Sequence, residues 1–346
     1  MQKTFFILSS ILLVNFSNLK AQAGKVCNWD GDKKAAVVLT FDDWSPGQYP
    51  IVVPELKERE MAATFFPMLS SIASWNHPWP DVIETVSYGN EIGNHTKSHP
   101  DLTKQTAGQL STEIKGAKKT IDENLTTQSV ISFDYPYGAY NDAIIDSVKN
   151  CGHIAARGVN SPTNYTYNFA VTDKDYYELR TFGMDNTTTT KAFFQQISKV
   201  INGEGLLIYM YHSVDDANGT YSDNWYAKVV QDSLQKQLDT LLSVKNKVWI
   251  TTLGQAIKYH REARCSTINE VSAWDGEKLV IELTDTLSDN ALFNQPLTIK
   301  LKMNGKHYTK AVQNNRELTI DSIKNDTIVF RAIPDDGNII LTNKRK

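Results

Sequence analysis

The sequence contains little cysteine and no strong excess of charge of one sign. Its 346 residues include three cysteines, Cys27, Cys151 and Cys265, whose spacings do not fit a cysteine-ligated zinc site. A Cys27–Cys265 bond and three unpaired thiols are both compatible with these positions, because an exported protein can keep a disulfide. The net charge is −3, and no stripe of lysine and arginine stands out. Nucleic acid is therefore not an expected partner.

Long apolar runs are also missing, apart from one near the N-terminus. Residues 5–14 are mainly apolar, but this run is shorter than the roughly 20 residues that span a bilayer. Lys3 precedes it and Ala21-Gln22-Ala23 follows it, which is the pattern of a signal peptide with its cleavage site. We expect residues 1–23 to be removed, leaving an exported chain in the periplasm, at the cell surface or in the medium, with no integral membrane segment. An uncleaved anchor is the alternative.

Short apolar runs alternate with helical patterns from about residue 35 to residue 265. This alternation predicts an α/β fold, with a parallel sheet covered by helices. Roughly seven or eight such units fit a distorted (β/α) barrel, and an open doubly wound sheet is the alternative. No glycine-rich loop follows the first strand, which argues against a nucleotide-binding domain. The expected strands are 35–41, 63–66, 91–93, 130–133, 153–156, 178–182, 206–211 and 248–251, and the expected helices include 53–61, 81–87, 106–125, 141–150 and 253–263.

The pattern changes after Cys265. Short alternating runs follow, separated by three dipeptides that are typical of hairpin turns: Asp275-Gly276, Asn304-Gly305 and Asp336-Gly337. No helical period appears there. We expect a small all-β accessory domain over residues 266–346, after a (β/α) catalytic domain over residues 24–265.

Two adjacent carboxylates, Asp42 and Asp43, end the first expected strand. Catalytic residues of barrel enzymes lie at the C-terminal ends of the strands. If the chain turns there, one carboxylate can bind a metal while the other serves as a base. Taken alone, such a pair is more often a turn or a helix cap.

Two histidines four residues apart form a second candidate. His95 and His99 would lie on one face of a helical turn and could bind one metal, with Asp43 completing a set of three ligands. Three protein ligands with open positions are typical of a catalytic metal. Pro100 disfavours helical geometry at His99, so we expect a short or irregular turn. A solvated histidine pair is the alternative.

A third candidate, His212, ends the apolar strand 206–211. A histidine at a barrel rim can act as a general acid, because its pKa lies near the working pH. A structural, hydrogen-bonded histidine is the alternative at this position.

Together these segments resemble the polysaccharide deacetylases, the family-four carbohydrate esterases. The resemblance covers roughly residues 35–265 and does not extend to the C-terminal segment. Its most specific part is the stretch from Glu91 to Leu102. The segments that match the family's first, second, third and last motifs are Thr40–Asp43, Glu91–Leu102, Tyr135–Gly138 and Leu206–His212.

The resemblance implies a distorted (β/α) barrel and a divalent metal, usually zinc, with cobalt or nickel as alternatives. It implies the following roles: Asp42 as base, His212 as acid, the backbone N–H of Tyr137 as an oxyanion donor, and Asp43, His95 and His99 as metal ligands.

The implied reaction removes N-acetyl groups from a polysaccharide that contains N-acetylglucosamine. Removal of O-acetyl groups from acetylated xylan or a similar glycan is one alternative. A non-catalytic carbohydrate-binding protein of the cell envelope is another.

The chain departs from the family pattern at two positions. Asp134 stands where the family often has an arginine that orients the base, and a carboxylate close to Asp42 would raise one of the two pKa values. Trp44 stands where glycine is usual, and its ring could narrow the groove or stack on a sugar. We expect substrate contacts from Trp44, Tyr135 and Arg180, and Arg180 is our candidate for the missing positive charge.

Overall fold

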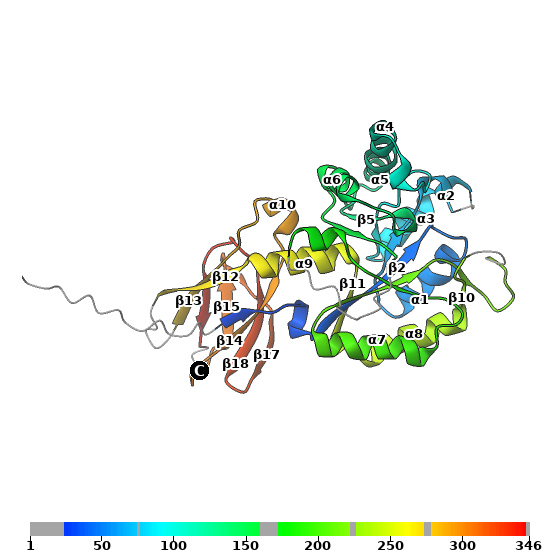
Figure 1. Ribbon diagram of the computed structural model, residues 1–346. Coiled ribbons are helices and arrows are strands. Elements are labelled where there is room, and N and C mark those ends of the chain that lie inside the picture. The colour runs from blue at the N-terminus through cyan, green and yellow to red at the C-terminus, as the bar shows by residue number, and fades with distance from the viewer. Residues whose placement is uncertain (1–23, 75–76, 160–171, 222–225, 273–277, 344–346) are drawn as a thin grey trace, which may run out of the picture.

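The computed structural model describes residues 24–74, 77–159, 172–221, 226–272 and 278–343. The expected signal peptide over residues 1–23 lies outside these ranges, as does the turn at Asp275-Gly276. Two units stand side by side, with helix α9 (Leu253–Cys265) at their junction (Figure 1). Across the described ranges, we find no helix long and apolar enough to cross a membrane.

The first unit is built on parallel strands, which confirms the α/β class. Its largest sheet has six strands, and every pairing within it is parallel. Strand β11 (Val248–Thr251) pairs with the first half of the central strand β2. The other five follow the order β4 (Glu91–Ile92), β3 (Thr64–Phe66), β2 (Ala35–Asp42), β8 (Leu206–Tyr211) and β7 (Phe182–Gly183).

A second parallel pair, β5 (Ser132–Asp134) and β6 (Ala155–Arg157), links the two edges of this sheet. An isolated bridge joins Asn94, beyond β4, to Phe133 in β5. Another bridge joins Arg157 in β6 to Leu179, ahead of β7. Strand neighbours therefore form a cycle that leads from β2 through β3, β4, β5, β6, β7 and β8 back to β2.

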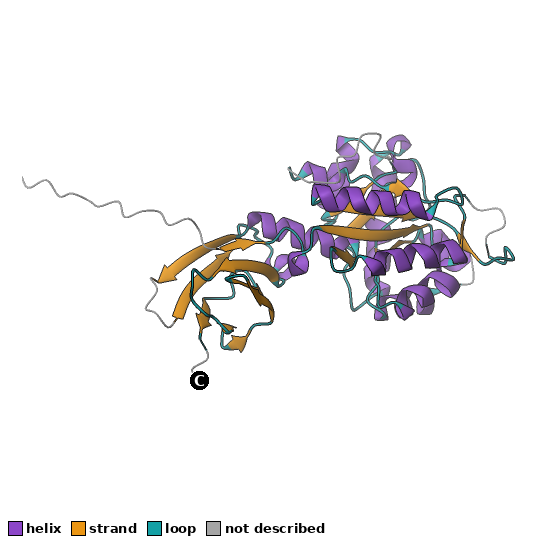
Figure 2. Cartoon of the chain, turned by 90° about the horizontal axis from the view of Figure 1, so that it is seen from below, coloured by secondary structure: helices purple, strands orange, loops and turns teal. Residues whose placement is uncertain are grey.

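Helices cover this set of strands, and Figure 2 shows them on both sides of it. The segment expected to be helical over residues 106–125 is helical, although its middle is a π-helix over Ser111–Gly116. Asn141 caps the helix that was expected over residues 141–150, since its side chain accepts the Ile144 N–H at 3.1 Å. The helices before α9 are α1 (Val53–Glu58), α2 (Leu69–Ser74), α3 (Trp79–Ser87), α4 (Ala107–Leu110), α5 (Ala117–Asn124), α6 (Asp142–Asn150), α7 (Thr190–Gly203) and α8 (Gln231–Ser243).

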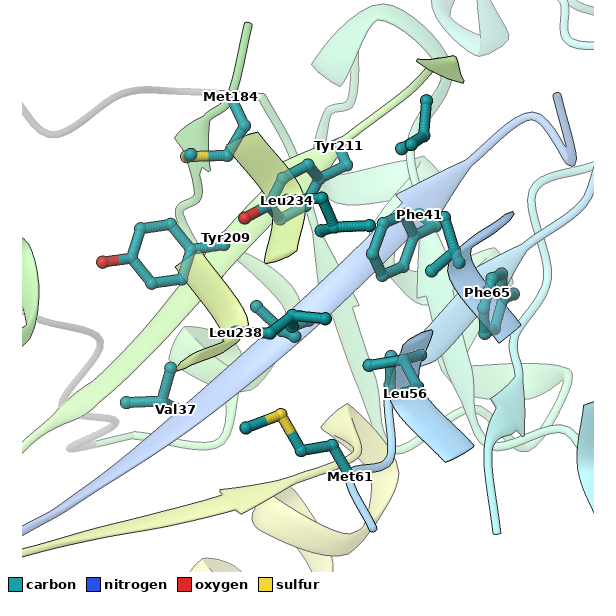
Figure 3. Close-up of a cluster of buried hydrophobic side chains, with 14 of the residues drawn as sticks. Val37, Phe41, Leu56, Met61, Phe65, Met184, Tyr209, Tyr211, Leu234 and Leu238 are labelled. Carbon is teal, nitrogen blue, oxygen red and sulfur yellow. The ribbon is translucent and has the colours of Figure 1, made fainter. Parts of the chain in front are cut away.

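The central strand β2 is buried on both faces, as all eight of its residues show. Successive side chains of a strand point to opposite faces, so Val37 and Val38 enter two different clusters of apolar side chains. The cluster around Val37 contains side chains from β2, β8, α1 and α8 (Figure 3). Burial on both sides explains why the strand is a continuous apolar run in the sequence.

The second unit consists of two antiparallel sheets that enclose an apolar core of their own. Both sheets contribute to this core, for example through Ile299 and Phe330 on one side and Ile281 and Leu341 on the other. The four-stranded sheet has the order β1 (Gly24–Val26), β14 (Leu297–Lys302), β18 (Thr327–Ala332) and β17 (Ile320–Lys324). The five-stranded sheet has the order β12 (Thr267–Ser272), β13 (Lys278–Thr284), β19 (Ile339–Thr342), β15 (Lys310–Gln313) and β16 (Arg316–Glu317).

A short helix, α10 (Asn290–Phe293), interrupts the strands of the second unit. The expectation that no helix follows Cys265 is therefore wrong for these four residues. Phe293 packs into an apolar cluster of the first unit, so α10 is part of the contact between the units.

Two of the expected hairpin turns do not form hairpins. Asn304-Gly305 and Asp336-Gly337 lie between strands that belong to different sheets. The hairpins β15–β16 and β17–β18 turn instead at Asn314-Asn315 and Asn325-Asp326, whose φ angles are all positive. Asn and Asp tolerate this left-handed conformation better than other residues with side chains, so these turns form without glycine.

Residues 24–32 connect the two units. Strand β1 pairs with β14 in the second unit, although it precedes the first strand of the first unit. Trp29 is fully buried, and its Nε1–H donates to the Glu204 carbonyl in the first unit at 2.8 Å. Asp30 pairs with Arg331 of the second unit at 2.8 Å. The division into domains at residues 24 and 265 therefore stays a proposal, because this segment belongs to both units.

The cysteines are free thiols in the structure, so the Cys27–Cys265 bond considered above is not formed. Cys27 is buried, and its thiol donates to Asp32 at 3.4 Å.

Glu262 is a buried acid at the junction of the units. Its carboxylate accepts the Gln295 N–H at 3.3 and 3.4 Å, and burial raises its pKa to about 8. An unfolded glutamate loses its proton near 4.5, so the stability of the fold decreases as the pH rises from there to about 8.

We predict that Glu262→Gln raises the melting temperature by a larger amount near pH 8 than near pH 5. Glutamine keeps the shape of the side chain and has no proton to lose, so only the wild type is destabilised at the higher pH. Thermal melts at both pH values test this, with the exposed Glu270→Gln as the control. A gain that is equal at the two pH values would contradict the prediction.

Candidate active site

The first part of the site is a turn at the end of β2. Asp42 closes the strand and is buried, while Asp43 and Trp44 adopt positive φ angles of 70° and 58°. Such angles in residues with side chains are strained, and strain of this kind gathers at functional sites. The Ser71 hydroxyl supports the turn by donating to the Asp43 carbonyl at 2.5 Å. The turn that the Asp42-Asp43 pair required is therefore present.

The two histidines lie on an irregular loop after β4. The turn is irregular, as we expected, because Thr96 and His99 have left-handed φ angles of 69° and 58°. Pro100 disfavours helical geometry at the preceding residue, as expected. Local hydrogen bonds hold the loop instead: the Asn94 side chain accepts the Thr96 N–H, and the Thr96 hydroxyl accepts the His99 N–H, each at 2.9 Å.

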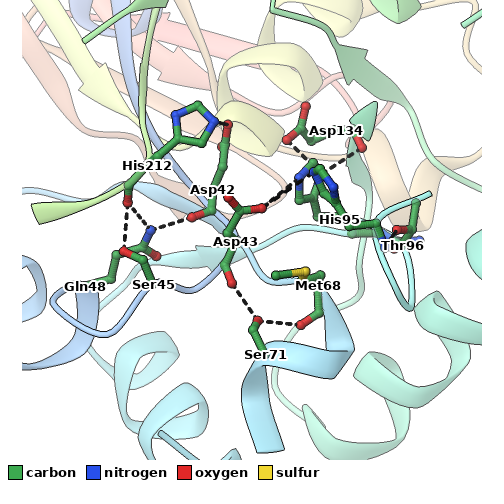
Figure 4. Close-up of polar contacts among 12 residues, drawn as sticks. Asp42, Asp43, Ser45, Gln48, Met68, Ser71, His95, Thr96, Asp134 and His212 are labelled. Atoms are coloured by element: carbon green, nitrogen blue, oxygen red, sulfur yellow. Dashed lines mark hydrogen bonds and ion pairs between the residues drawn. The ribbon is translucent and has the colours of Figure 1, made fainter. Parts of the chain in front are cut away.

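Asp43, His95 and His99 meet at one point. Figure 4 shows Asp43 and His95 facing each other there. One donor atom from each lies within 4.8 Å of the other two. Asp43 Oδ1 is 3.3 Å from His95 Nε2 and 3.7 Å from His99 Nε2. Ligands about 2.1 Å from a tetrahedral zinc ion are about 3.4 Å apart, so one carboxylate and two imidazoles fit a divalent cation here.

The charges at this cluster suit a cation. Burial acts to raise the pKa of Asp43, but the hydrogen bond and charge of His95 lower it to about 2, so this carboxylate is ionised. Burial acts to lower the pKa of His95, while the carboxylates of Asp134 and Asp43 raise it well above its ordinary value. A cation that takes the place of the His95 proton would satisfy the same carboxylates, and its binding would release that proton.

The positive charge next to Asp42 comes from Arg157, the last residue of β6. Arg157 is fully buried, and its Nη1 donates to Asp134 Oδ1 at 2.8 Å while its Nη2 donates to Asp42 Oδ1. Our assignment of this charge to Arg180 was wrong, and Arg180 is exposed. Arg157 directly follows the expected strand 153–156, so its position after a strand is the signal that could have identified it.

Asp134 lies between Arg157 and His95 of the Asp-His-His cluster. Its Oδ2 is 2.8 Å from His95 Nδ1, and the side chain is buried. Burial raises the pKa of Asp42; Arg157 acts to lower it, and the charge of Asp134 raises it further, as expected from the sequence.

His212 follows β8 and faces Asp42. Its Nε2 is 3.7 Å from Asp42 Oδ2. The Ser45 hydroxyl and the Gln48 amide donate to the His212 carbonyl at 2.9 and 2.7 Å, and the same Gln48 amide donates to the Asp42 carbonyl at 2.6 Å. Burial lowers the pKa of His212 to about 4, so the imidazole is neutral at pH 7.

Two of the expected substrate contacts are corrected by the structure. Trp44 and Tyr135 are fully buried, so neither ring can stack on a sugar. The Trp44 indole donates to the His77 carbonyl at 3.1 Å and packs edge-on against Phe65.

The exposed aromatic rings at the site are different ones. Tyr137 is 65% exposed and lies edge-on to His99, and Tyr226 is 74% exposed and lies edge-on to His212. Sequence reasoning missed the ring of Tyr137 and all of Tyr226, because an aromatic residue in a loop has no periodicity that marks it. The contact expected from Arg180 stays a prediction.

The described part of the chain thus combines an α/β fold with an Asp-His-His cluster at the strand ends, which is a candidate metal centre. Residues 30–156 match the family model described as polysaccharide deacetylase, so this part of the chain is similar to that family.

Several curated relatives are similar to this chain over part of their length. A chitooligosaccharide deacetylase of Sinorhizobium fredii is 30% identical over 141 residues, which are 39% of this chain and 62% of that protein. A peptidoglycan-N-acetylmuramic acid deacetylase of Bacillus subtilis is 28% identical over 123 residues, which are 35% of this chain and 45% of that protein. The chain thus spans about half the length of the curated relatives it matches.

A solved structure supports the fold. A Mycobacterium smegmatis protein assigned to the polysaccharide deacetylases superimposes with a TM-score of 0.51 at 13% identity, over 68% of this chain and 93% of that one. At this identity the likeness shows the fold alone.

We predict that the protein binds one zinc ion and that His99→Ala lowers the affinity by at least about 100-fold, more than the loss of an outer partner of a ligand costs. Competition with a chromophoric chelator measures the dissociation constant. The exposed His307→Ala is the matched control and should bind zinc like the wild type. Equal affinity of the His99→Ala protein would show that the ion binds elsewhere.

We predict that Trp44→Ala lowers the free energy of unfolding by about 3–5 kcal/mol, since it removes a large buried side chain. Urea unfolding measures this loss. Tyr226→Ala, at an exposed ring, should change it by no more than about 0.5 kcal/mol. If the Trp44→Ala protein were as stable as the wild type but had a raised KM, Trp44 would contact the substrate after all, and the prediction would be wrong.

Proposed function

We propose that the protein is a metal-dependent hydrolase that removes acetyl groups from a carbohydrate, most specifically the N-acetyl groups of an N-acetylglucosamine-containing polysaccharide. The observation that carries this proposal is the convergence of Asp43, His95 and His99 beside Asp42 and His212. The names of the relatives, which include chitooligosaccharide and peptidoglycan deacetylases, agree with this substrate class.

The wider organisation is part of the same proposal. The cycle of strand neighbours supports a distorted (β/α) barrel as the catalytic domain over residues 24–265. The two antiparallel sheets support an accessory domain over residues 266–346. An acetylated polymer is an extracellular substrate, which agrees with export through the expected signal peptide.

The metal would be held by Asp43, His95 and His99. Zinc suits one carboxylate and two imidazoles best, and cobalt or nickel could replace it. When bound, such an ion supplies Lewis-acid polarisation of a carbonyl and lowers the pKa of water to about 7 in the best sites.

Asp42 and His212 would move the protons. Asp42 takes a proton from the attacking water as the new C–O bond forms, and the backbone N–H of Tyr137 stabilises the oxyanion. The C–N bond then breaks, and the leaving nitrogen needs a proton because an amide anion is a very poor leaving group. His212 is neutral at pH 7, so it can deliver a proton only after gaining one, and Asp42 is 3.7 Å away.

Exposed rings would bind the sugar. Tyr137 and Tyr226 lie beside His99 and His212, so they flank the reacting groups and can stack on the apolar faces of neighbouring sugar rings. Arg180 is proposed as a further polar contact.

The test is acetate release from three substrates: N-acetylglucosamine oligomers, a peptidoglycan glycan and acetyl-xylan. We predict release from the N-acetylated substrates and a kcat about 10²–10⁴-fold lower for Asp42→Asn, which lacks the base. The exposed Asp146→Asn on α6 is the matched control and should retain the wild-type rate.

Two results would refute the proposal: no acetate from any substrate with zinc-loaded protein, or an undiminished rate for Asp42→Asn. If acetate were released from acetyl-xylan alone, the protein would still be a hydrolase, but it would cleave O-acetyl esters rather than N-acetyl amides.

A further inference from the structure

We propose that Arg157 and Asp134 are positioning residues that join the base to the metal-binding histidine: Arg157 orients Asp42, and Asp134 orients His95. This inference rests on the proposed function. Both residues lie outside the four sequence segments that resemble the family's motifs, and Asp134 stands where that family often has an arginine.

Arg157 is placed to hold one geometry. It lies on β6 next to Asp134 on β5, since the two are direct partners in the strand register. Its guanidinium lies over the Phe66 ring, 4.9 Å from the ring centre, and is fully buried. A planar fork in such a slot can contact two carboxylates at once, whereas the single ammonium of a lysine cannot reproduce both contacts.

Asp134 uses its two oxygens for different partners. Oδ1 accepts from Arg157 at 2.8 Å, and Oδ2 lies 2.8 Å from His95 Nδ1. His95 Nδ1 also lies 3.1 Å from the Asp134 backbone carbonyl, so an Nδ1–H faces two acceptors of the same residue. This tautomer leaves Nε2 unprotonated and directed at the cation, and the carboxylate adds negative charge that the carbonyl does not supply. His95 Nε2 is also the atom that lies 3.3 Å from Asp43 Oδ1.

The charge balance of the cluster explains why both residues are needed. The buried or nearly buried carboxylates of Asp42, Asp43 and Asp134 face the one guanidinium of Arg157. A divalent cation beside Asp43 would add positive charge to this acid-rich cluster. Asp134 therefore strengthens cation binding. Arg157 pairs with Asp42 and Asp134, and its charge offsets the repulsion between these two buried carboxylates.

The two roles predict different defects. Asp134→Asn should raise the zinc dissociation constant by about 10–100-fold, the usual loss when a ligand's outer partner is removed. Excess zinc should then restore much of its activity. Arg157→Lys keeps the charge but misplaces Asp42, so kcat should fall by about 10–100-fold with KM and zinc affinity within about 3-fold of wild type, and excess zinc should not restore it.

The experiment measures the zinc dissociation constant by chelator competition, and kcat and KM for acetate release at saturating zinc, on the full chain. The matched controls have the same changes elsewhere: Asp81→Asn removes a carboxylate 3.2 Å from His77 Nδ1, and Arg261→Lys alters an arginine that bridges Asp173 and the Ile154 carbonyl. Both should match the wild type in zinc affinity and kcat.

A measurement on the wild type covers the case in which a variant fails to fold. In ¹⁵N-labelled, zinc-loaded protein, the His95 signals should show a protonated Nδ1 and a metal-bound Nε2. Binding through Nδ1, or an unchanged zinc affinity in Asp134→Asn, would overturn the role of Asp134. A wild-type kcat in Arg157→Lys would overturn the role of Arg157. Absence of acetate release by the wild type would instead refute the proposed function, while the zinc and NMR results would still decide how His95 is held.

Discussion

The repulsion between buried carboxylates is the constraint on which the candidate site depends. Asp42, Asp43 and Asp134 come from two strand ends that the parallel arrangement brings to one edge, and each is largely removed from water. Ions in such surroundings persist only when they are paired and hydrogen-bonded. The strand order answers this need, because it places β6 beside β5 and so brings a buried guanidinium between two of the acids. A bound cation would supply the positive charge next to the third acid, Asp43.

Much of the architecture could be predicted where the local signal was strong. Strands β8 and β11 begin and end where their apolar runs do, and the cluster of Asp43, His95 and His99 followed from residue types whose chemistry is narrow. Arg157 could not be found in this way, because its partner Asp42 lies 115 residues away and only the strand register brings them together. Trp44 was misjudged for a similar reason: strained backbone angles at the turn determine where its ring goes, and no sequence pattern records them.

The second unit shows the limits of turn signals. A dipeptide such as Asn304-Gly305 specifies a local change of direction, but it does not specify which strand the chain pairs with next. In a protein with two stacked sheets, the chain passes from one sheet to the other at some turns and doubles back within a sheet at others. Packing of the apolar faces decides between these outcomes, and that information is distributed over the whole unit rather than held in two residues.

The pairing of β1 with β14 has a consequence for how the chain folds. Residues 24–26 lie against residues 299–301, so this sheet joins segments from almost opposite ends of the described chain. Contacts between such distant segments form slowly, because a very large loop must close first. Until then, β14 presents an unpaired edge to which another chain could add. Residues 24–26 thus complete the four-stranded sheet, and a change of sequence at these residues would act on the second unit rather than on the cluster of Asp43, His95 and His99.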